Sequence, residues 1–498
     1  MPHRIVLDRP LTWRQVADVA EGGTLGLSDA AQARIRAARA LVESIVRKGV
    51  RAYGVNTGVG ALCDIVIPES KQERLSRNIV MSHAVGIGSP LEPMAVRAII
   101  AAAINNFSLG FSGVRPAVVD ALLALLEFDC APQVPAAGSV GYLTHMAHIA
   151  LVLIGEGSAR WHGRAVGGAE ALASMRRAPL VLGAKEGLSL VNGTPCATGL
   201  SALALARTLR LLDAADITAA MTFENLHGQL AAFDADALGL RVSAGVRRVG
   251  ERLRAALSGS VILERSAGHR TQDALSLRAV PQVHGAARDL FIRTAQVVDE
   301  ELASATDNPV ILGTADEPRA LSGANAVGAA LGLSADSLGI AVAEVAAMSE
   351  RRMDRLVNPL VSNLPAFLSM DEGAGSGFMI AQYAAVSLVA ENRRLAAPAS
   401  LDGGVTSGLQ EDHLSHATPG ALKLLKIIDN AEAILAIELL AAAQAYDLQS
   451  APRARAPYTD AVYRWVRAGI ARYDDDRPLG ADIQSARELL KGPLPDLL

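Results

Sequence analysis

The sequence of 498 residues has few cysteines, few aromatic residues and no excess of positive charge. Its three cysteines, Cys63, Cys130 and Cys196, are scattered without CxxC spacing. This indicates a reducing compartment and excludes both a disulfide framework and a cysteine metal site. Lys and Arg total 47 against 51 Asp and Glu, a formal net charge of −4. Because nucleic-acid binding depends on a basic excess, we expect neither nucleic acid nor a membrane surface as a partner.

Long hydrophobic runs and a secretory leader are also missing. No uninterrupted apolar run reaches the ~18 residues of a membrane span, and the longest candidate, Ala147–Gly155, is too short. The first residues, MPHRIVLDRP, contain no apolar core of the kind found in signal peptides. Together with the cysteine usage, this predicts a cytoplasmic protein.

Helical periodicity is the strongest positive signal. Half of the residues are hydrophobic and 20% are charged, so the chain can bury a large core and is not disordered. Long Ala-rich periodic stretches cover Leu331–Leu356, Gly377–Ala396 and Ala421–Leu448. At 1.5 Å per residue the first would be a rod of roughly 40 Å. We predict an all-α fold with a long central helix bundle and a loop-rich N-terminal part.

Glycine-rich loops set the first 200 residues apart. They are YGVNTGVG at 53–60, AVGIGSP at 84–90 and AAGSVG at 136–141. None is a P-loop or a dinucleotide-binding loop, so no nucleotide is expected. We therefore predict two parts: residues 1–200 as an N-terminal active-site part, and residues 201–498 as the long-helix bundle and C-terminal part.

Several polar residues are candidates for chemistry, although each also has a structural interpretation. Tyr53 is either a packing aromatic or a general base. Arg278, in an apolar context, suits a carboxylate because of its planar fork. His145 and His148 have the i, i+3 spacing of metal ligands, but no acidic third ligand lies near them in the sequence, so no metal is expected.

Taken together, these segments resemble the histidine/phenylalanine ammonia-lyase family. The matching segments run in family order: YGVNTGVG, SHAVGIGSPL, VPAAGSVG, AHIALVLIGEG, GLSLVNGTP, QDALSLRAVPQVHG, TDNP, SERRMDRLVNP, LPAFL, SGFMIAQYAA, ENRRLAAPAS and GLQEDHLS. The resemblance is closest to the histidine-type members, because of Ser82-His83 and Gln410-Glu411.

The resemblance implies an all-α homotetramer whose active sites take residues from three chains. It implies a carbon–nitrogen lyase that eliminates ammonia from an L-amino acid, histidine or one with a related or aromatic side chain, to give the α,β-unsaturated acid. These enzymes use 4-methylidene-imidazol-5-one (MIO), an electrophile that the backbone forms at Ala-Ser-Gly by cyclising and losing two waters. The electrophile binds the substrate amine, and a basic tyrosine removes the β-proton.

Site residues follow from the matching motifs. Tyr53 would be the base and Arg278 the carboxylate clamp. Asn192 and Gln272 would orient the substrate and the prosthetic group. His83 and Glu411 would face the substrate side chain or amine, as in the histidine-type members. The expected substrate-binding set also includes Leu275, Asn325 and Ala326.

The chain departs from the family where the electrophile is expected. Gly141 is followed at once by Tyr142, and the flanks match if three residues are absent between them. One explanation is a natural deletion. The other, which we favour, is that the fused group is a single non-standard residue omitted from the written sequence. We therefore expect MIO between Gly141 and Tyr142, with both residues in the catalytic centre.

Further departures bear on the substrate. Leu275 stands where the family has Tyr, Ala326-Val327 where it has Phe-His, and Tyr142 and His145 where it has Asp and Pro. These changes remove a hydrogen bond and a stacking wall, so ordinary L-histidine is not the expected best substrate. Two alternatives stay open: an MIO-dependent 2,3-aminomutase, or an MIO-free homologue that eliminates a pre-activated amine or serves as an assembly protein.

Overall fold

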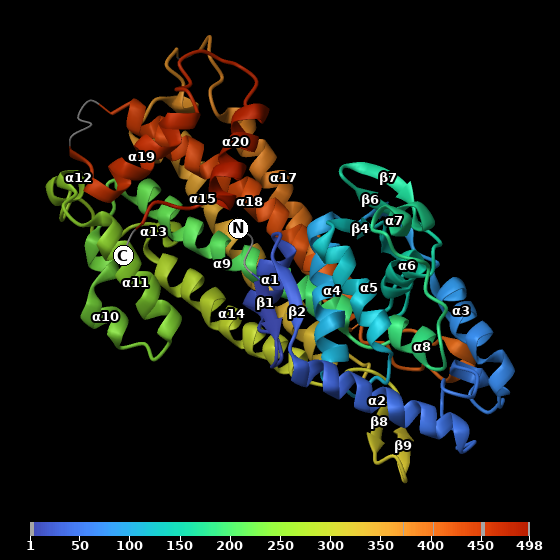
Figure 1. Ribbon diagram of the computed structural model, residues 1–498. Helices are drawn as coiled ribbons and strands as arrows, with labels where there is room; N and C mark the ends of the chain where they lie inside the picture. The colour runs from blue at the N-terminus through green and yellow to red at the C-terminus, as the bar shows by residue number, and fades with distance from the viewer. Residues whose placement is uncertain (1–3, 372, 402, 450–453, 497–498) are drawn as a thin grey trace. The chain divides into compact units, whose positions relative to one another are not determined.

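The computed structural model describes residues 4–371, 373–401, 403–449 and 454–496 (Figure 1). It is 61% helix and 8% strand, which confirms the mainly helical class. The chain forms two compact units. The first comprises the described residues of Met1–Ala206, Thr294–Asp336 and Pro398–Leu422, and the second those of Arg207–Arg293, Ser337–Ala397 and Lys423–Leu498.

The first unit contains short helices joined by loops and small sheets. Its strands are β1 Arg4–Leu7, β2 Thr24–Leu27, β3 Ile87–Pro90, β4 Cys130–Pro132, β5 Pro135–Ala137, β6 Ser158–Trp161, β7 Arg164–Gly167, β8 Val310–Gly313 and β9 Pro318–Leu321. Its helices are α1 Trp13–Ala20, α2 Asp29–Arg47, α3 Gln72–His83, α4 Pro93–Ser108, α5 Pro116–Glu127, α6 Thr144–Leu153, α7 Gly168–Ser174 and α8 Glu186–Val191, with 3₁₀ turns η1 Gly60–Leu62, η2 Glu69–Lys71 and η5 Ser407–Leu409.

The regular elements of the second unit, in the part that the structure describes, are helices and 3₁₀ turns joined by loops. It contains α10 Ala235–Gly239, α11 Ala244–Leu257, α12 Val261–Arg265, α13 Leu275–Arg278, α16 Pro359–Ser362, α17 Met379–Leu395, α19 Pro457–Gly469 and α20 Gly480–Lys491, with 3₁₀ turns η3 Leu230–Phe233 and η4 Ala366–Leu368. Four long helices contribute residues to both units: α9 Pro195–Asn225, α14 Val280–Leu302, α15 Ala329–Val357 and α18 Ala417–Asp447.

Helix α2 illustrates how the sequence specifies a local element. The Ser28 side chain accepts a hydrogen bond from the Ala31 N–H and caps the first turn. Ile35, Val42 and Ile45 then recur at helical spacing and are fully or almost fully buried. Val42 and Ile45 join a core cluster that also contains Ala52, Val55, Ala184 and Ile311. This cluster supports the loop that begins after residue 50.

Small sheets are a feature that the sequence analysis did not predict. The longest strands have four residues, too few for a visible alternation of apolar and polar side chains. The pairing of β3 with β5 is antiparallel and places Ile87 opposite Ala137. It therefore joins two of the glycine-rich loops, those at 84–90 and 136–141.

The three long periodic stretches are helices, as predicted: α15, α17 and α18. In the second unit, α17 and α18 lie side by side (Figure 1), and Asn430 Nδ2 of α18 donates to Asn392 Oδ1 of α17 at 2.9 Å. Buried charges also link the helices. Glu438 of α18 accepts hydrogen bonds from Arg352 of α15 at 2.6 and 2.9 Å and from Thr222 of α9 at 2.8 Å.

Two helical stretches are longer and more apolar than the sequence analysis expected. Glu186–Asn225 and Ala329–Val357 reach mean hydropathies of 1.2 and 1.4 and could cross a membrane by length and composition alone. Their most apolar windows are 100% and 61% buried. Core helices of soluble proteins satisfy the same criterion, so we interpret both as core helices.

The Arg352–Glu438 pair provides a test of this bundle. Both side chains are 0% exposed, so Arg352→Met leaves a buried carboxylate without its cation. We expect the α18 amides to lose about 3–5 kcal/mol of protection against hydrogen exchange. The matched control is Arg464→Met, whose pair with Asp460 has side chains that are 70% and 30% exposed and whose loss should cost at most about 1 kcal/mol. Equal effects of the two substitutions would contradict this role.

Candidate active site

Tyr53 lies in a loop whose backbone is held on both sides. Ala52 and Val55 belong to the core cluster, and the Ala52 N–H donates to Asn56 Oδ1 at 2.8 Å. Gly54 has φ +59, and a Cβ there would lie 2.1 Å from Leu188 Cδ2 of α8. Only glycine meets both conditions. The loop therefore fixes the backbone position from which the Tyr53 side chain extends.

The Tyr53 hydroxyl oxygen accepts a hydrogen bond from the Gly60 N–H at 3.0 Å. Burial raises the pKa of this phenol, the Gly60 hydrogen bond opposes that rise, and the negative charge of Glu411 adds to it. The turn η1, which directly follows this loop, contacts η5, since the Ala61 N–H donates to Ser407 Oγ at 3.3 Å. Tyr53 and the 407–411 segment are thus brought together, although about 350 residues separate them.

Tyr142 provides a second phenol, which lies beside Glu411. Its hydroxyl donates to Glu411 Oε2 at 2.8 Å. Burial is the main cause that raises its pKa, and the hydrogen bond and charge of Glu411 raise it further. Tyr142 therefore stays protonated near neutral pH and acts as a donor. The expected residues Tyr53, Tyr142 and Glu411 form one group, which we call the phenol–carboxylate cluster.

The backbone beside Tyr142 is held by three hydrogen bonds. Ser139 Oγ donates to the Tyr142 carbonyl at 3.0 Å, and the Leu143 N–H donates to the Val191 carbonyl at 3.1 Å. Thr418 Oγ1 donates to the Gly141 carbonyl at 2.7 Å. The segment that carries the expected catalytic pair Gly141 and Tyr142 is therefore attached to the end of α8 and the start of α18.

Asn192 is 6% exposed and lies directly after α8. Its Nδ2 donates to the Asn308 carbonyl at 2.8 Å. Asn308 Oδ1 in turn accepts from the Gly323 N–H at 2.8 Å, at the start of the loop that carries Asn325 and Ala326. Asn308 thus links Asn192 to the loop that carries Asn325 and Ala326.

A buried ion pair holds this arrangement, and sequence reasoning missed it. Lys185 Nζ lies 2.8 Å from Asp307 Oδ2 and 2.8 Å from Ser189 Oγ. Burial lowers the pKa of Lys185, while the charge of Asp307 raises it. The signal was present, because Asp307 belongs to the TDNP motif, but no role was assigned to that motif.

His83, Asn325 and Ala326 are also in the first unit. His83 ends α3, and its Nδ1 lies 3.1 Å from Ser82 Oγ. Burial lowers the pKa of His83. Asn325 is exposed and donates from Nδ2 to the Ala305 carbonyl at 3.0 Å, whereas Ala326 is buried. The described contacts of His83 and Asn325 are thus with residues outside the phenol–carboxylate cluster.

Gln272, Leu275 and Arg278 belong to the second unit. Gln272 is exposed, and Leu275 and Arg278 are the first and last residues of α13, with Leu275 64% exposed. Arg278 Nε is buried and has no hydrogen-bond partner among the described residues. Asp273 anchors this segment by accepting from the Gln229 N–H at 2.6 Å.

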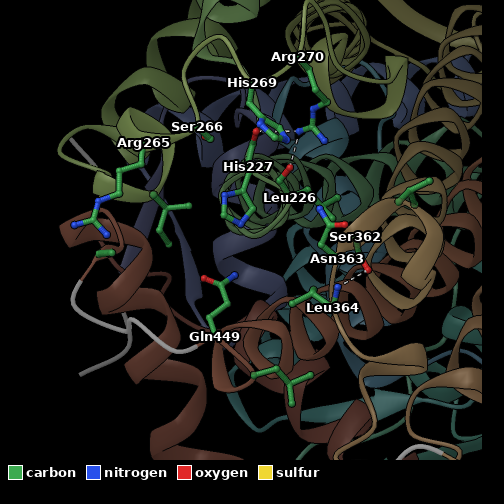
Figure 2. Close-up of a pocket in the computed structure, with 14 residues that line it drawn as sticks. Leu226, His227, Arg265, Ser266, His269, Arg270, Ser362, Asn363, Leu364 and Gln449 are labelled. Atoms are coloured by element: carbon green, nitrogen blue, oxygen red, sulfur yellow. Dashed lines mark hydrogen bonds between the residues drawn. The ribbon is translucent and has the colours of Figure 1, made fainter.

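A cavity of about 590 Å³ lies in the second unit. Figure 2 shows His227, Gln449 and Asn363 around it, together with Arg265 and Arg270. None of the expected site residues lines this cavity. Size alone therefore does not identify the chemical site of this chain.

Metal ligation finds no support among the described residues, where no group of three His, Cys, Asp or Glu side chains is placed to hold an ion. The histidines of α6 contact the backbone instead. His145 Nε2 lies 3.0 Å from the Ala136 carbonyl, and His148 Nε2 accepts from the Gly86 N–H at 3.0 Å. Both histidines help to hold the glycine-rich loops.

The junction of Gly141 and Tyr142 has features that fit an additional backbone group. Leu143 has φ +78 and ψ −72, and the Thr144 N–H donates to the Tyr142 carbonyl at 3.2 Å. This is a γ-turn of the rare, strained kind. Ser415 Oγ is buried without a partner among the described residues and lies 2.8 Å from where a Cβ on Gly141 would be. A strained backbone turn and a hydroxyl without a partner among the described residues thus lie together at the position expected for the electrophile.

Comparison with known proteins identifies the family of this chain. The family model of aromatic amino acid lyases matches residues 11–468. A histidine ammonia-lyase of Deinococcus radiodurans is 43% identical over 497 residues, covering 98% of this chain and 94% of the relative.

Solved structures are similar over the same length. Tyrosine aminomutase from Streptomyces globisporus has a TM-score of 0.93 at 33% identity, covering 98% of this chain and 96% of that one. Histidine ammonia-lyase from Trypanosoma cruzi has a TM-score of 0.90 at 36% identity, covering 98% and 93%. The sequence resemblance is thus confirmed, and this chain belongs to the aromatic amino acid lyases, a family of carbon–nitrogen lyases.

Proposed function

We propose that this protein eliminates ammonia from an L-amino acid with a histidine-like or aromatic side chain and releases the α,β-unsaturated acid. The observation that carries the proposal is the phenol–carboxylate cluster beside the Gly141–Tyr142 junction. It combines a candidate base with a candidate amine acceptor next to the expected electrophile. The names of the relatives, histidine ammonia-lyase among them, support the same reaction.

The prosthetic group of this proposal is MIO between Gly141 and Tyr142. When present, it supplies an electrophile for the substrate amine. Thr418, Ser415 and Asn192 would hold it. The Thr418 hydroxyl already contacts the Gly141 carbonyl, and the Ser415 hydroxyl is buried beside Gly141 without a partner among the described residues. The Asn192 amide follows directly after α8 and is held by its hydrogen bond to Asn308. The strained turn at Leu143 supports an inserted group there.

The chain's own residues divide the remaining tasks. Tyr53 removes the β-proton, and the Gly60 N–H favours its phenolate by donating to its oxygen. Glu411 accepts from the substrate's amine. Arg278 binds the substrate carboxylate through its planar fork. Gln272 and Asn192 orient the substrate, with His83, Leu275, Asn325 and Ala326 around its side chain.

We also propose a cytoplasmic homotetramer in which three chains contribute to each site. The exposure of Gln272 and Leu275 supports this, because exposed residues of this kind can complete a site elsewhere in an assembly. In this proposal residues 1–200 carry the electrophile loop and residues 201–498 form the bundle. The substrate is a small amino acid, and no metal, nucleotide, nucleic acid or membrane takes part.

A second candidate is a 2,3-aminomutase that uses the same residues and returns the amine to the β-carbon. The structural similarity to a tyrosine aminomutase supports this candidate. An MIO-free homologue that eliminates a pre-activated amine is the third, and it requires a true deletion after Gly141.

The first test is the intact mass of the purified protein, with a peptide map across residues 134–160. We expect a mass excess equal to Ala-Ser-Gly less two waters, located between Gly141 and Tyr142. That excess would establish the precursor and its cyclisation together. A mass that equals the written sequence would mean a true deletion, and MIO chemistry would then be impossible in this chain.

The second test is Tyr53→Phe. Removing the hydroxyl removes the proposed base, so we expect turnover to fall about 10²–10⁴-fold while the oligomeric state stays unchanged. Chromatography of the products for both the unsaturated acid and the β-amino acid distinguishes lyase from aminomutase. Tyr458→Phe is the matched control, because its hydroxyl donates to the Pro495 carbonyl at 2.9 Å in the second unit. Full activity of Tyr53→Phe would exclude Tyr53 as the base.

The third test is Arg278→Lys. A lysine keeps the charge but loses the bidentate fork. We expect KM to rise about tenfold or more, which corresponds to the loss of one charge-assisted hydrogen bond, with a smaller change in kcat. Arg265→Lys, at an exposed arginine of the same unit, should leave KM unchanged. An unaltered KM in Arg278→Lys would remove the carboxylate role.

A further inference from the structure

Asp273 lies between two residues of the second unit and is itself fully buried. It follows Gln272 and precedes Ala274, the N-cap of α13, and its side chain is 0% exposed. Its Oδ2 accepts a hydrogen bond from the Gln229 N–H at 2.6 Å, and its Oδ1 lies 3.0 Å from Nη2 of Arg270. Because a buried carboxylate needs such partners, the two contacts fix where Asp273 lies.

Arg270 connects this carboxylate to the end of α9. Its Nη2 donates to the carbonyls of Leu226 and His227 at 2.6 and 2.9 Å (Figure 2). The two carbonyls directly follow the last helical residue, Asn225, and the C-terminal end of a helix attracts a cation. The guanidinium thus holds Asp273 against a rigid helix end.

Gln229 holds the same segment at further points. Its Oε1 accepts from the Gly268 N–H at 2.8 Å, and its Nε2 donates to the Ser266 carbonyl at 3.0 Å. Together with its backbone bond to Asp273, Gln229 contacts residues 266–273 at three places. The segment also borders the cavity of about 590 Å³, which Ser266 helps to line. On that side, polar contacts rather than packing hold the segment.

Helix α13 depends on this anchor because it is a single turn, Leu275–Arg278. One turn gains too little from its own hydrogen bonds to fix an orientation. Side chains of this stretch point to two sides, since Asp273 and Leu277 are buried and Gln272 is exposed. A rotation of the stretch would therefore move Gln272 and Arg278 together.

Arg278 takes its direction from the backbone of this turn. Its N–H donates to the Ala274 carbonyl at 3.0 Å. Its Nε is buried and has no hydrogen-bond partner among the described residues. The guanidinium is thus presented by α13 with a donor still free, and the orientation of α13 follows from Asp273.

We propose that Asp273 and Arg270 are a positioning pair for substrate binding, which holds α13 so that Arg278 binds the substrate's carboxylate. This inference rests on the proposed function, because it takes Arg278 as the carboxylate clamp, and it adds the residues that orient that clamp. Neither Asp273 nor Arg270 touches the substrate in this scheme.

The experiment compares ligands that differ only at the carboxyl group: L-phenylalanine with L-phenylalaninol, and L-histidine with L-histidinol. Calorimetry gives their dissociation constants in the Tyr53→Phe background, with and without Asp273→Asn. The asparagine keeps the size of the side chain and an acceptor for the Gln229 N–H, but it removes the charge opposite Arg270. We expect the amino acids to bind about tenfold more weakly and the amino alcohols to bind unchanged.

A second arm asks whether the effect passes through Arg278. In the Arg278→Lys protein the fork that Asp273 would orient is already lost, so Asp273→Asn should not weaken amino-acid binding further. In the protein with Tyr53 intact, we expect Asp273→Asn to raise KM about tenfold with a smaller change in kcat. A merely structural role would weaken the binding of acids and alcohols alike and would persist in Arg278→Lys.

Arg270→Lys keeps the test decisive if Asp273→Asn does not fold. The Arg270 side chain is 32% exposed, and a lysine keeps its charge but loses the fork that reaches the helix end and Asp273 together. We expect the same selective loss of amino-acid binding. Asp234→Asn is the matched control, because Asp234 is an exposed N-cap of α10 in the same unit and accepts from the Ala237 N–H at 2.9 Å.

The outcomes separate the two proposals. Unchanged amino-acid binding, equal weakening of acids and alcohols, or an effect of Asp273→Asn that persists in Arg278→Lys would each overturn the positioning role while leaving the lyase reaction standing. Absence of both turnover and binding of amino acids in the wild-type protein would overturn the proposed function and this inference with it.

Discussion

The buried pair of Lys185 and Asp307 is the constraint on which the candidate site depends most. Both side chains are almost fully buried, at 0% and 1% exposure, and burying either charge alone would be very unfavourable. The pair can therefore exist only if α8 and the TDNP segment meet in one arrangement, which Ser189 completes. Asn192 follows directly from α8 and bonds to Asn308. The ion pair thus fixes the position of α8 against the TDNP segment more than it contributes to the free energy of unfolding.

The second unit uses the same device in its helix bundle. Alanine-rich helices present small, similar surfaces, so apolar packing alone distinguishes poorly between neighbouring registers. Buried carboxylates remove that ambiguity, because each needs particular donors. Asp216 of α9 accepts from Arg252 at 2.9 Å and lies 2.9 Å from His284 Nδ1, which joins α9 to α11 and α14. Glu438 does the same for α9, α15 and α18. Polar specificity in an apolar bundle is a known use of buried charge.

The sequence predicted α15, α17 and α18, because helical periodicity over twenty residues or more is a strong signal, but it did not single out the long helices α9 and α14. It did not predict the small sheets, since strands of three or four residues carry no alternation. For the site, the family motifs named Tyr53, Tyr142 and Glu411, but not the hydrogen bond between the last two. Those residues are 269 positions apart, and Tyr142 departs from the family. No local pattern could reveal that a substituted residue bonds to a motif residue so distant in the chain.

The electrostatics around Tyr53 add one further step. Burial and the charges of Glu411 and Cys63 all raise the pKa of this phenol, and only the Gly60 hydrogen bond lowers it. A phenol that must lose its proton near neutral pH needs hydrogen bonds to its oxygen or a positive charge beside it. In the first unit the groups that act on Tyr53 provide the Gly60 hydrogen bond and no positive charge. In the proposed function a positive charge would come with the substrate's ammonium group. Because Glu411 would hold that ammonium group, the carboxylate that disfavours the phenolate in the empty site becomes neutralised when substrate binds.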